Sequence, residues 1–313
     1  MSISRRNRAI FVELEATAGT AETLVNVDVV QVQDLQVNVA ESLRMNEREI
    51  IRSSLNPEKA VYGGAKIGFQ FTVELKGSGS AGTAPRIGDL LQACSLSETV
   101  VGATSVTYAP QSDLTLHKTV TIGYMEGGNY RIAKGCRGTF SIDLTAGQYG
   151  KVTFNLRGRI HSESVAAAPT PSFESTVPPA FVGATFVVGA YAAVIEKLTM
   201  DIANNLVDGT NPNNSDGFGA LTTITGRATR GTINPEVELI SAKDFVGIFR
   251  AGTDQAIGTG VIGGTAGNRF ALSVPNAYFR NVGDGNRDEL LTYEIEYGAR
   301  DTNGTDDFSL AFT

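Results

Sequence analysis

The stretch Lys66–Lys76, KIGFQFTVELK, carries the clearest structural signal in the chain. Its odd-numbered positions are apolar, and its even-numbered positions are polar or glycine. Successive side chains of a strand point to opposite faces, so this alternation predicts a half-buried β-strand with one apolar and one polar face. The same alternation recurs at Leu35–Val39 and at Leu198–Ile202. These three segments predict a protein built mainly from β-strands.

Further strands and two short helices complete the predicted fold. One helix is expected at 85–94, entered through Pro85, and another at 241–251, with Ser241 as its N-cap and Gly252 as its terminator. The sequence therefore predicts an all-β fold with short flanking helices. The remaining strands are expected at 105–108, 118–124, 138–144, 151–159, 269–274 and 290–297.

A proline-rich segment divides the chain into two parts that follow one order. Residues 166–179 contain four prolines, which cannot join a central ladder of strands. We expect a first β domain at 1–165, a linker at 166–180 and a second β domain at 181–313. In each part a strand (30–40, 194–203) precedes a long excursion (41–65, 204–220), a second strand (66–76, 221–240) and a helix. This order indicates an internal duplication; the alternative is one irregular β protein with a chance match.

The composition argues against several classes of function. The 313 residues include 33 acidic and 26 basic side chains, which argues against a strongly basic nucleic-acid binder. No apolar run approaches the roughly 20 residues of a membrane-spanning helix. The N-terminus lacks a signal-peptide core, so we expect synthesis in a cytoplasm. With two cysteines and two histidines, the chain offers little for catalysis or metal binding.

Individual motifs point to no chemistry either. Gly77–Gly82, GSGSAG, matches the dinucleotide-binding pattern, but its surroundings indicate antiparallel strands rather than the βαβ unit that this pattern requires. Asp208–Gly217 is rich in Asp and Asn, but it lacks the spacing of a calcium loop. We therefore predict no enzyme activity, no catalytic residue, no metal site and no cofactor. The cysteines and histidines without a suitable partner are Cys94, Cys136, His117 and His161.

The segment Ala65–Val106, followed by Thr-Tyr-Ala-Pro, resembles the major tail tube proteins of long flexible-tailed, siphovirus-type bacteriophages. It reads AKIGFQFTVELKGSGSAGTAPRIGDLLQACSLSETVVGATSV, with the family's Gly-Ser-Gly turn, Gly-Thr-Ala-Pro helix start and Leu-Leu-x-Ala-Cys helix. The charged loop with Glu47, Arg48, Arg52 and Leu55 and the C-terminal segment 290–313 also fit. The resemblance covers most of the chain and departs from the family at 204–220.

This resemblance implies a β-sandwich or split-barrel unit with one flanking helix. Such units assemble into rings, and the rings stack into a hollow tube that conducts DNA during genome ejection. Related tubes have six units per ring, so a duplicated chain would form homotrimeric pseudo-sixfold rings, and a single-unit chain would form homohexamers. The implied partners are other copies of the chain, tail tip and tail terminator proteins, and double-stranded DNA in transit. The implied location is the virion tail, assembled in the host cytoplasm, with no membrane insertion.

In such a tube, the polar faces of the long strands would line the channel. Four carboxylates against two lysines make this wall mildly acidic, which would let DNA slide because a basic wall would bind phosphates. The alternative is an ordinary solvated sheet face. The expected lumen-facing residues are Gln36, Asn38, Lys66, Gln70, Thr72, Glu74, Lys197, Thr199, Asp201, Thr232, Asn234, Glu236 and Glu238.

The excursion at 41–65 is a candidate for ring stacking. Its charged side chains surround apolar ones, a composition that suits an interface. The alternative is a flexible surface loop, against which the apolar pair at 50–51 argues, because it would be exposed on a monomer. The expected stacking residues are Arg44, Glu47, Arg48, Ile50, Ile51, Arg52 and Leu55.

Two other classes of protein provide alternatives. A non-catalytic β-sandwich that binds a receptor or carbohydrate, in a phage tail tip or fibre, would need exposed aromatic platforms, yet the chain has no tryptophan. A virion-associated hydrolase would need a catalytic constellation that the sequence does not provide. The tail tube subunit is the interpretation that the residues favour.

Overall fold

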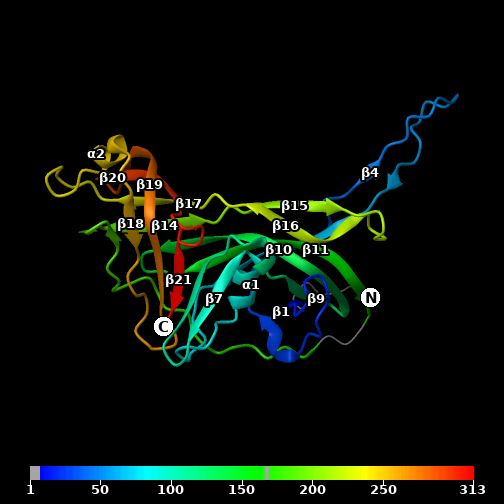
Figure 1. Cartoon of the computed structure of the whole chain (residues 1–313), viewed down its shortest axis with the longest axis horizontal. Coiled ribbons are helices and arrows are strands. Elements are labelled where there is room, and N and C mark those ends of the chain that lie inside the picture. Colours follow the sequence, from blue (N-terminus) through cyan, green and yellow to red (C-terminus); the bar gives the residue numbers. More distant parts are fainter. Residues whose placement is uncertain (1–7, 166–168) are drawn as a thin grey trace.

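A computed structural model describes residues 8–165 and 169–313 of the chain (Figure 1). Strands dominate it, joined by two short α-helices, α1 (Gly88–Ala93) and α2 (Phe245–Ala251), and two 3-10 turns, η1 (Asn26–Asp28) and η2 (Leu114–Leu116). The expected all-β class with short helices is confirmed. Up to residue 165 the strands are β1 (Arg8–Leu14), β2 (Val29–Val30), β3 (Gln33–Glu41), β4 (Met45–Asn46), β5 (Val61–Tyr62), β6 (Lys66–Glu74), β7 (Leu96–Val101), β8 (Ser105–Pro110), β9 (Val120–Glu126), β10 (Asn129–Thr145) and β11 (Lys151–Ser164).

The second part of the chain repeats this strand-rich character. Its strands are β12 (Val187–Val188), β13 (Tyr191–Ala192), β14 (Ile195–Asp201), β15 (Asn205–Thr210), β16 (Phe218–Gly226), β17 (Arg230–Pro235), β18 (Gln255–Gly258), β19 (Phe270–Arg287), β20 (Leu290–Ala299) and β21 (Ser309–Phe312). The strands β15 and β16 form a hairpin of their own, as do β4 and β5.

One antiparallel sheet of eight strands runs through both parts of the chain. Its order is β3–β6–β11–β10–β14–β17–β20–β19. The remaining strands branch from β10, through β9, β1 and β2, and from β19, through β18 and through β21, β8 and β7. Among the described residues these pairings never close on themselves, so the sheet is open and its two end strands are β3 and β19.

Alternating side chains explain why these segments form this sheet. In β6, Ile67, Phe69, Phe71 and Val73 are buried, as the alternation predicted. They join one apolar core that also holds residues of the second part of the chain, such as Phe270. Burial of apolar area stabilises the sheet by about 25 cal/mol per Å², so the apolar face fixes the register of each strand.

The helix α2 begins later than expected. Its N-cap is Asp244, whose carboxylate accepts a 2.7 Å hydrogen bond from the Gly247 amide, and the expectation of Ser241 as the cap is wrong. The reason is local, because the amides of residues 242 and 243 bond back to the Leu239 carbonyl in a separate turn. Gly252 ends the helix as expected, in the left-handed conformation with φ of 61°.

The expected single strand at 221–240 is wrong, because the strand is broken between β16, which belongs to the separate hairpin, and β17, which belongs to the large sheet. At that break, Arg227 and Thr229 both bind the buried carboxylate of Asp307, at 2.7 and 2.9 Å. This side-chain anchor turns the backbone, so that β16 pairs with β15 while β17 pairs with β14 and β20.

The proline-rich linker lies along the surface without joining a sheet over 169–179. Its Ser172 amide bonds to the Asn26 carbonyl at 3.0 Å, and Lys76 donates to its Thr176 carbonyl at 2.9 Å. Residues 166–168 lie outside the described part of the chain. The division into two units stays a prediction, because the two parts share one sheet and one core.

We predict that Glu13→Gln stabilises the protein at alkaline pH. Burial, together with the carboxylates of Asp28 and Asp89, raises the pKa of Glu13 from 4.5 to about 7. An acid with a raised pKa costs no stability below pH 4.5 and destabilises the fold as the pH rises through 7. The variant should therefore gain about 1–2 kcal/mol in unfolding free energy at pH 8, after allowance for solvent screening, and nothing at pH 4. Urea unfolding at both pH values measures this, and an equal gain at pH 4 and pH 8 would contradict it.

Candidate functional site: a polar sheet face and a projecting arm

The eight-stranded sheet presents a continuous polar face opposite its apolar core. The strand register places one polar residue of each strand beside the next in a single row across seven strands. This row consists of Glu74, Lys151, Asp143, Thr199, Thr232, Glu296 and Asn281. Of this row, Glu74, Thr199 and Thr232 were expected from the sequence to share a polar face. Sequence reasoning missed Lys151, Asp143, Glu296 and Asn281, although the alternation in their strands is the same.

The polar side chains on this face bind one another across the strands. The hydroxyls of Thr72 and Thr153 lie 3.0 Å apart, and those of Thr199 and Thr232 lie 2.7 Å apart. Lys197 forms a 2.7 Å ion pair with Asp143. These pairs are partly exposed, so they orient the side chains while contributing little stability.

Most residues expected to line a channel share this face, but they do not all lie in comparable surroundings. Glu236 follows the end of β17 and is held by Arg287, and Glu238 is exposed in the loop that follows. The residues that lie in the strands of the face are Gln36, Asn38, Gln70, Thr72, Glu74, Lys197, Thr199, Asp201, Thr232 and Asn234.

Lys66 does not face an open surface, and the expectation that it lines a channel is wrong. Its side chain is fully buried beneath the β15–β16 hairpin. The ammonium donates hydrogen bonds to the Asp208 carboxylate at 2.8 Å and to the Thr222 hydroxyl at 2.9 Å. Burial lowers the pKa of Lys66, and Asp208 compensates part of this cost. The segment 204–220 gave no sign in the sequence that it would fold back over this strand.

Charges of both signs alternate on the polar face. Groups of both signs lie on it, so the mild acidity expected from the sequence stays a prediction. The acidic groups include Glu74, Asp143, Asp201, Glu294 and Glu296, and the basic groups include Lys151, Arg157, Lys197, Arg230 and Arg280.

The polar face has two hollows, one over strands of the first part of the chain and one over strands of the second part. One, of about 520 Å³, lies over β3, β6 and β11 and is bordered by Asn38, Gly68 and Arg157. The other, of about 500 Å³, lies over β14, β17 and β20 and is bordered by Asp201, Arg230 and Glu296. The strands under the two hollows match in their order along the chain, which is the pattern that a duplication produces.

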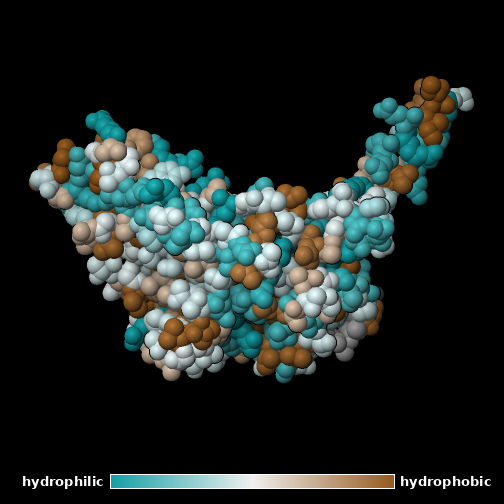
Figure 2. Space-filling view, in the orientation of Figure 1, coloured by the Kyte–Doolittle hydropathy of each residue, from teal (hydrophilic) through white to brown (hydrophobic). Residues whose placement is uncertain are grey.

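The segment 42–65 forms an arm that projects away from the rest of the molecule (Figure 1). The short strands β4 and β5 pair along it, and its end is apolar (Figure 2). Ile51 and Leu55 are fully exposed, with relative accessibilities of 102% and 105%. Arg52 braces this end through a 2.6 Å ion pair with Glu58. Such apolar exposure on an ordered projection indicates a surface that another molecule covers.

Arg44 differs from the other residues expected to act in stacking. It lies at the base of the arm, where its guanidinium stacks 3.8 Å from the centre of the Phe218 ring and donates to the Gly217 carbonyl. Arg44 is thus engaged within its own chain. The remaining candidates are exposed along the arm or at its end: Glu47, Arg48, Ile50, Ile51, Arg52 and Leu55.

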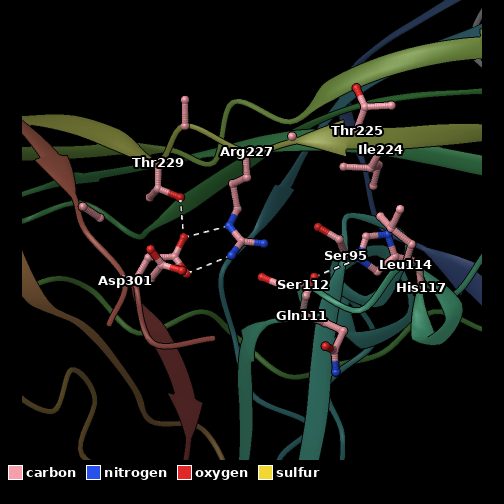
Figure 3. A pocket seen from close by; sticks show the side chains of 14 residues that line it. Ser95, Gln111, Ser112, Leu114, His117, Ile224, Thr225, Arg227, Thr229 and Asp301 are labelled. Carbon is pink, nitrogen blue, oxygen red and sulfur yellow. Dashed lines mark hydrogen bonds and ion pairs between the residues drawn. The ribbon is translucent and has the colours of Figure 1, made fainter. Parts of the chain in front are cut away.

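A pocket near the base of the β15–β16 hairpin is lined by residues of three loops that contact one another (Figure 3). Arg227 and Thr229 converge there on Asp307, and the His117 ring bonds to the Gln111 carbonyl at 2.8 Å. Burial lowers the pKa of His117, so the ring is neutral at pH 7. These contacts hold three loops together without pairing a nucleophile with a base.

The cysteines and acidic groups add no reactive centre in the described residues. Cys94 and Cys136 are buried, and burial raises the pKa of each thiol, which keeps it protonated. No cluster of His, Cys, Asp and Glu suited to a metal ion occurs within residues 8–165 and 169–313. His161 lies in β11.

Comparison with known families shows which protein family the chain belongs to. The model of the family described as "Phage tail tube protein" matches residues 6–299. The chain belongs to the phage tail tube protein family. No curated protein matches the chain.

Membership of the tail tube family gives the chain a structural role in the virion tail. Tail tube proteins associate with copies of themselves, which accords with an open sheet and a projecting arm that the monomer leaves uncovered. In the part of the chain that the structure describes, no helix is long and apolar enough to cross a membrane.

We predict that Lys66→Met destabilises this tail tube protein by about 2–4 kcal/mol, because it leaves the Asp208 carboxylate without its ammonium partner in a buried site. Urea unfolding of the monomer at pH 7 measures the change. Arg52→Met is the matched control, because its ion pair with Glu58 is largely exposed and should cost less than about 1 kcal/mol. Equal small losses in both variants would contradict the role assigned to Lys66.

Proposed function

We propose that the chain forms rings that stack into the tube of a long flexible-tailed phage, with the polar sheet face lining a channel for DNA. The observation that carries this proposal is the continuous eight-stranded polar face. Among the described residues, β3 at one end of it and residues 278–287 of β19 at the other have a strand partner on one edge only. Each such end strand presents unpaired backbone N–H and C=O groups, which favour pairing with another chain. A ring of copies pairs every end strand and leaves no sheet edge open.

The pairing within the chain indicates how two copies would join. β10 and β19 occupy corresponding places in the two halves, as do β14 and β3. Residues 141–145 of β10 pair with β14. Among the described residues, the corresponding part of β19, residues 278–287, pairs only with β20, and β3 pairs only with β6. We infer that β19 of one copy pairs with β3 of the next, in the same way as β10 pairs with β14.

The number of strands sets a lower limit on how many copies can enclose DNA. An eight-stranded barrel has an interior just wide enough for side chains, so one chain closed on itself would leave no channel. Three chains contribute 24 strands, and at about 4.8 Å per strand the circumference is at least about 115 Å. Such a barrel is wider than the 16–18-stranded barrels that already contain a water-filled channel. Three duplicated chains therefore give a pseudo-sixfold ring; six chains are the alternative if the halves are not equivalent.

The charge of the polar face suits transport of DNA. Acidic groups such as Glu74 and Glu296 lie between basic groups such as Lys151 and Arg230. Lys197 pairs with Asp143, and Arg230 lies near Asp201. Such neighbouring carboxylates reduce the number of sites at which phosphates could displace counterions and bind. DNA would therefore pass through without being held.

The end of the arm is proposed to contact an adjacent ring. Ile50, Ile51 and Leu55 provide an apolar surface, and Glu47, Arg48 and Arg52 surround it with charge. Burial of the apolar side chains would drive stacking, while the charges would fix the orientation of one ring on the next. Tail tip and tail terminator proteins would cover the two ends of the tube, and assembly would take place in the host cytoplasm.

Electron microscopy of the purified, concentrated protein tests this function. We expect rings with a central pore, hollow tubes at higher concentration, and threefold symmetry in end-on averages. Rings that contain six chains by mass would contradict the trimeric ring and leave the tube in place. Monomers at every concentration would contradict self-assembly by the isolated chain.

A change at the arm separates ring formation from stacking. We predict that Ile51→Asp combined with Leu55→Asp abolishes tubes but preserves rings, because charge at the apolar end prevents its burial. Val100→Asp is the matched control, since Val100 is also exposed but lies on β7, away from the arm (Figure 1). Full-length tubes of the double variant, measured by negative-stain microscopy and sedimentation, would contradict a stacking role for the arm.

A further inference from the structure

The arm and the β15–β16 hairpin leave the sheet at corresponding places. The arm connects β3 to β6, whose last register pair is Glu41 with Lys66. The hairpin occupies 202–229 and connects β14 to β17, whose last register pair is Asp201 with Arg230. The two segments are of similar length, and each continues the pair of strands from which it emerges. They are therefore equivalent elements of the two halves.

Within the chain, the hairpin lies across strands of the other half. Arg157 of β11 donates to the Leu206 carbonyl at 2.7 Å, and Arg159 forms a 2.6 Å ion pair with Asp216. Arg137 of β10 donates to the Thr222 carbonyl at 3.3 Å. The hairpin reaches these strands because β14, which it continues, is paired with β10. Its far end then meets the base of the arm, where Gly217 accepts from Arg44.

The corresponding strands of the second half carry no such cover within the chain. Arg230 occupies the place of Lys66, but its side chain is 56% exposed and its nearest carboxylate, Asp201, is 3.8 Å away. Lys66, by contrast, is fully buried by the hairpin. Likewise, Leu206 of the hairpin borders the hollow over β6 and β11, whereas the hollow beside Arg230 and Arg280 is open on that side.

We propose that the arm of each copy lies across β17, β20 and β19 of the next copy in the same ring. There it would take the position that the β15–β16 hairpin takes on β6, β11 and β10 within the chain. This inference rests on the proposed ring, because pairing of β3 with the neighbour's β19 carries the arm onto that surface. The occupant is thus a second copy of this chain, and the shared interface is formed by its residues 42–65.

Length and charges of both signs favour this placement. The arm exposes Glu47 and Glu49 beside Arg48 and Arg52, and the receiving face exposes Arg230 and Arg280 beside Asp201 and Glu296. An arm of nearly the hairpin's length would end beside residues 227–229 of the neighbour, next to the pocket drawn in Figure 3. The apolar end at Ile51 and Leu55 would extend toward the next ring. One arm would therefore serve both the ring and the stack.

Photo-cross-linking of assembled protein tests this placement. A photo-reactive phenylalanine analogue replaces Val61, an exposed residue on the side of the arm, in the full chain. We expect most intermolecular cross-links to map to β17, β19 and β20 of another copy. The same analogue at Val25, exposed beside η1, is the matched control and should give no cross-links to these strands. Arg230→Glu should reduce the yield from position 61, because it repels the glutamates of the arm.

Repeating the cross-linking in a variant whose rings do not stack distinguishes failure of this inference from failure of the proposed function. Cross-linking is repeated with Ile51→Asp and Leu55→Asp, which should leave rings without stacks. Persistence of the cross-links in these rings supports an arm that docks within the ring. Cross-links that appear in tubes but vanish in unstacked rings, or that map elsewhere, overturn this inference while the tube stands. Absence of any ring overturns the proposed function and this inference together.

Discussion

Backbone groups at the two ends of one sheet set the constraint on which the rest of the structure depends. Every N–H and C=O of a strand needs a partner, and a sheet that does not close leaves two rows of them unsatisfied. Here the eight-stranded sheet ends in β3 on one side and in residues 278–287 of β19 on the other. The core, the polar face and the arm are all arranged around this open sheet. The proposed ring would satisfy these groups by pairing the two ends of sheets from neighbouring copies.

The two halves of the chain show what a closed arrangement looks like. β10 and β14 already pair across the junction of the halves, and the β15–β16 hairpin already covers strands of the other half. The buried pair of Lys66 and Asp208 fixes that cover, because either charge alone would be costly in such a site. In the proposed ring, this pairing of β10 with β14 is the model for the contact between β19 of one copy and β3 of the next.

Alternation of side chains made much of the fold predictable from the sequence. The segments around Phe71, Leu198 and Ile295 all form strands whose apolar side chains enter one core, because a period of two has only one arrangement with a buried face. The linker was predictable because proline cannot donate to a ladder. The polar residues of the candidate channel wall followed from the same alternation.

Long-range contacts were not predictable in this way. Nothing near Lys66 in the sequence indicates that Asp208, from the other half of the chain, would bury it. The break between β16 and β17 depends on Asp307, which is equally distant in sequence. The start of α2 was missed because Ser241 and Asp244 are both good N-caps, and only the position of the Gly247 amide distinguishes them.

Hydrogen exchange measured on the monomer and on the assembled protein tests the central claim most directly. The account predicts that amides of β3 and of residues 278–287 exchange quickly in the monomer and become strongly protected on assembly, because they form a new ladder. Amides of β10 and β14 between 141 and 145 and between 197 and 201 should be protected in both states, since they already pair. Assembly that leaves β3 and the end of β19 unprotected would contradict closure of the sheet between copies.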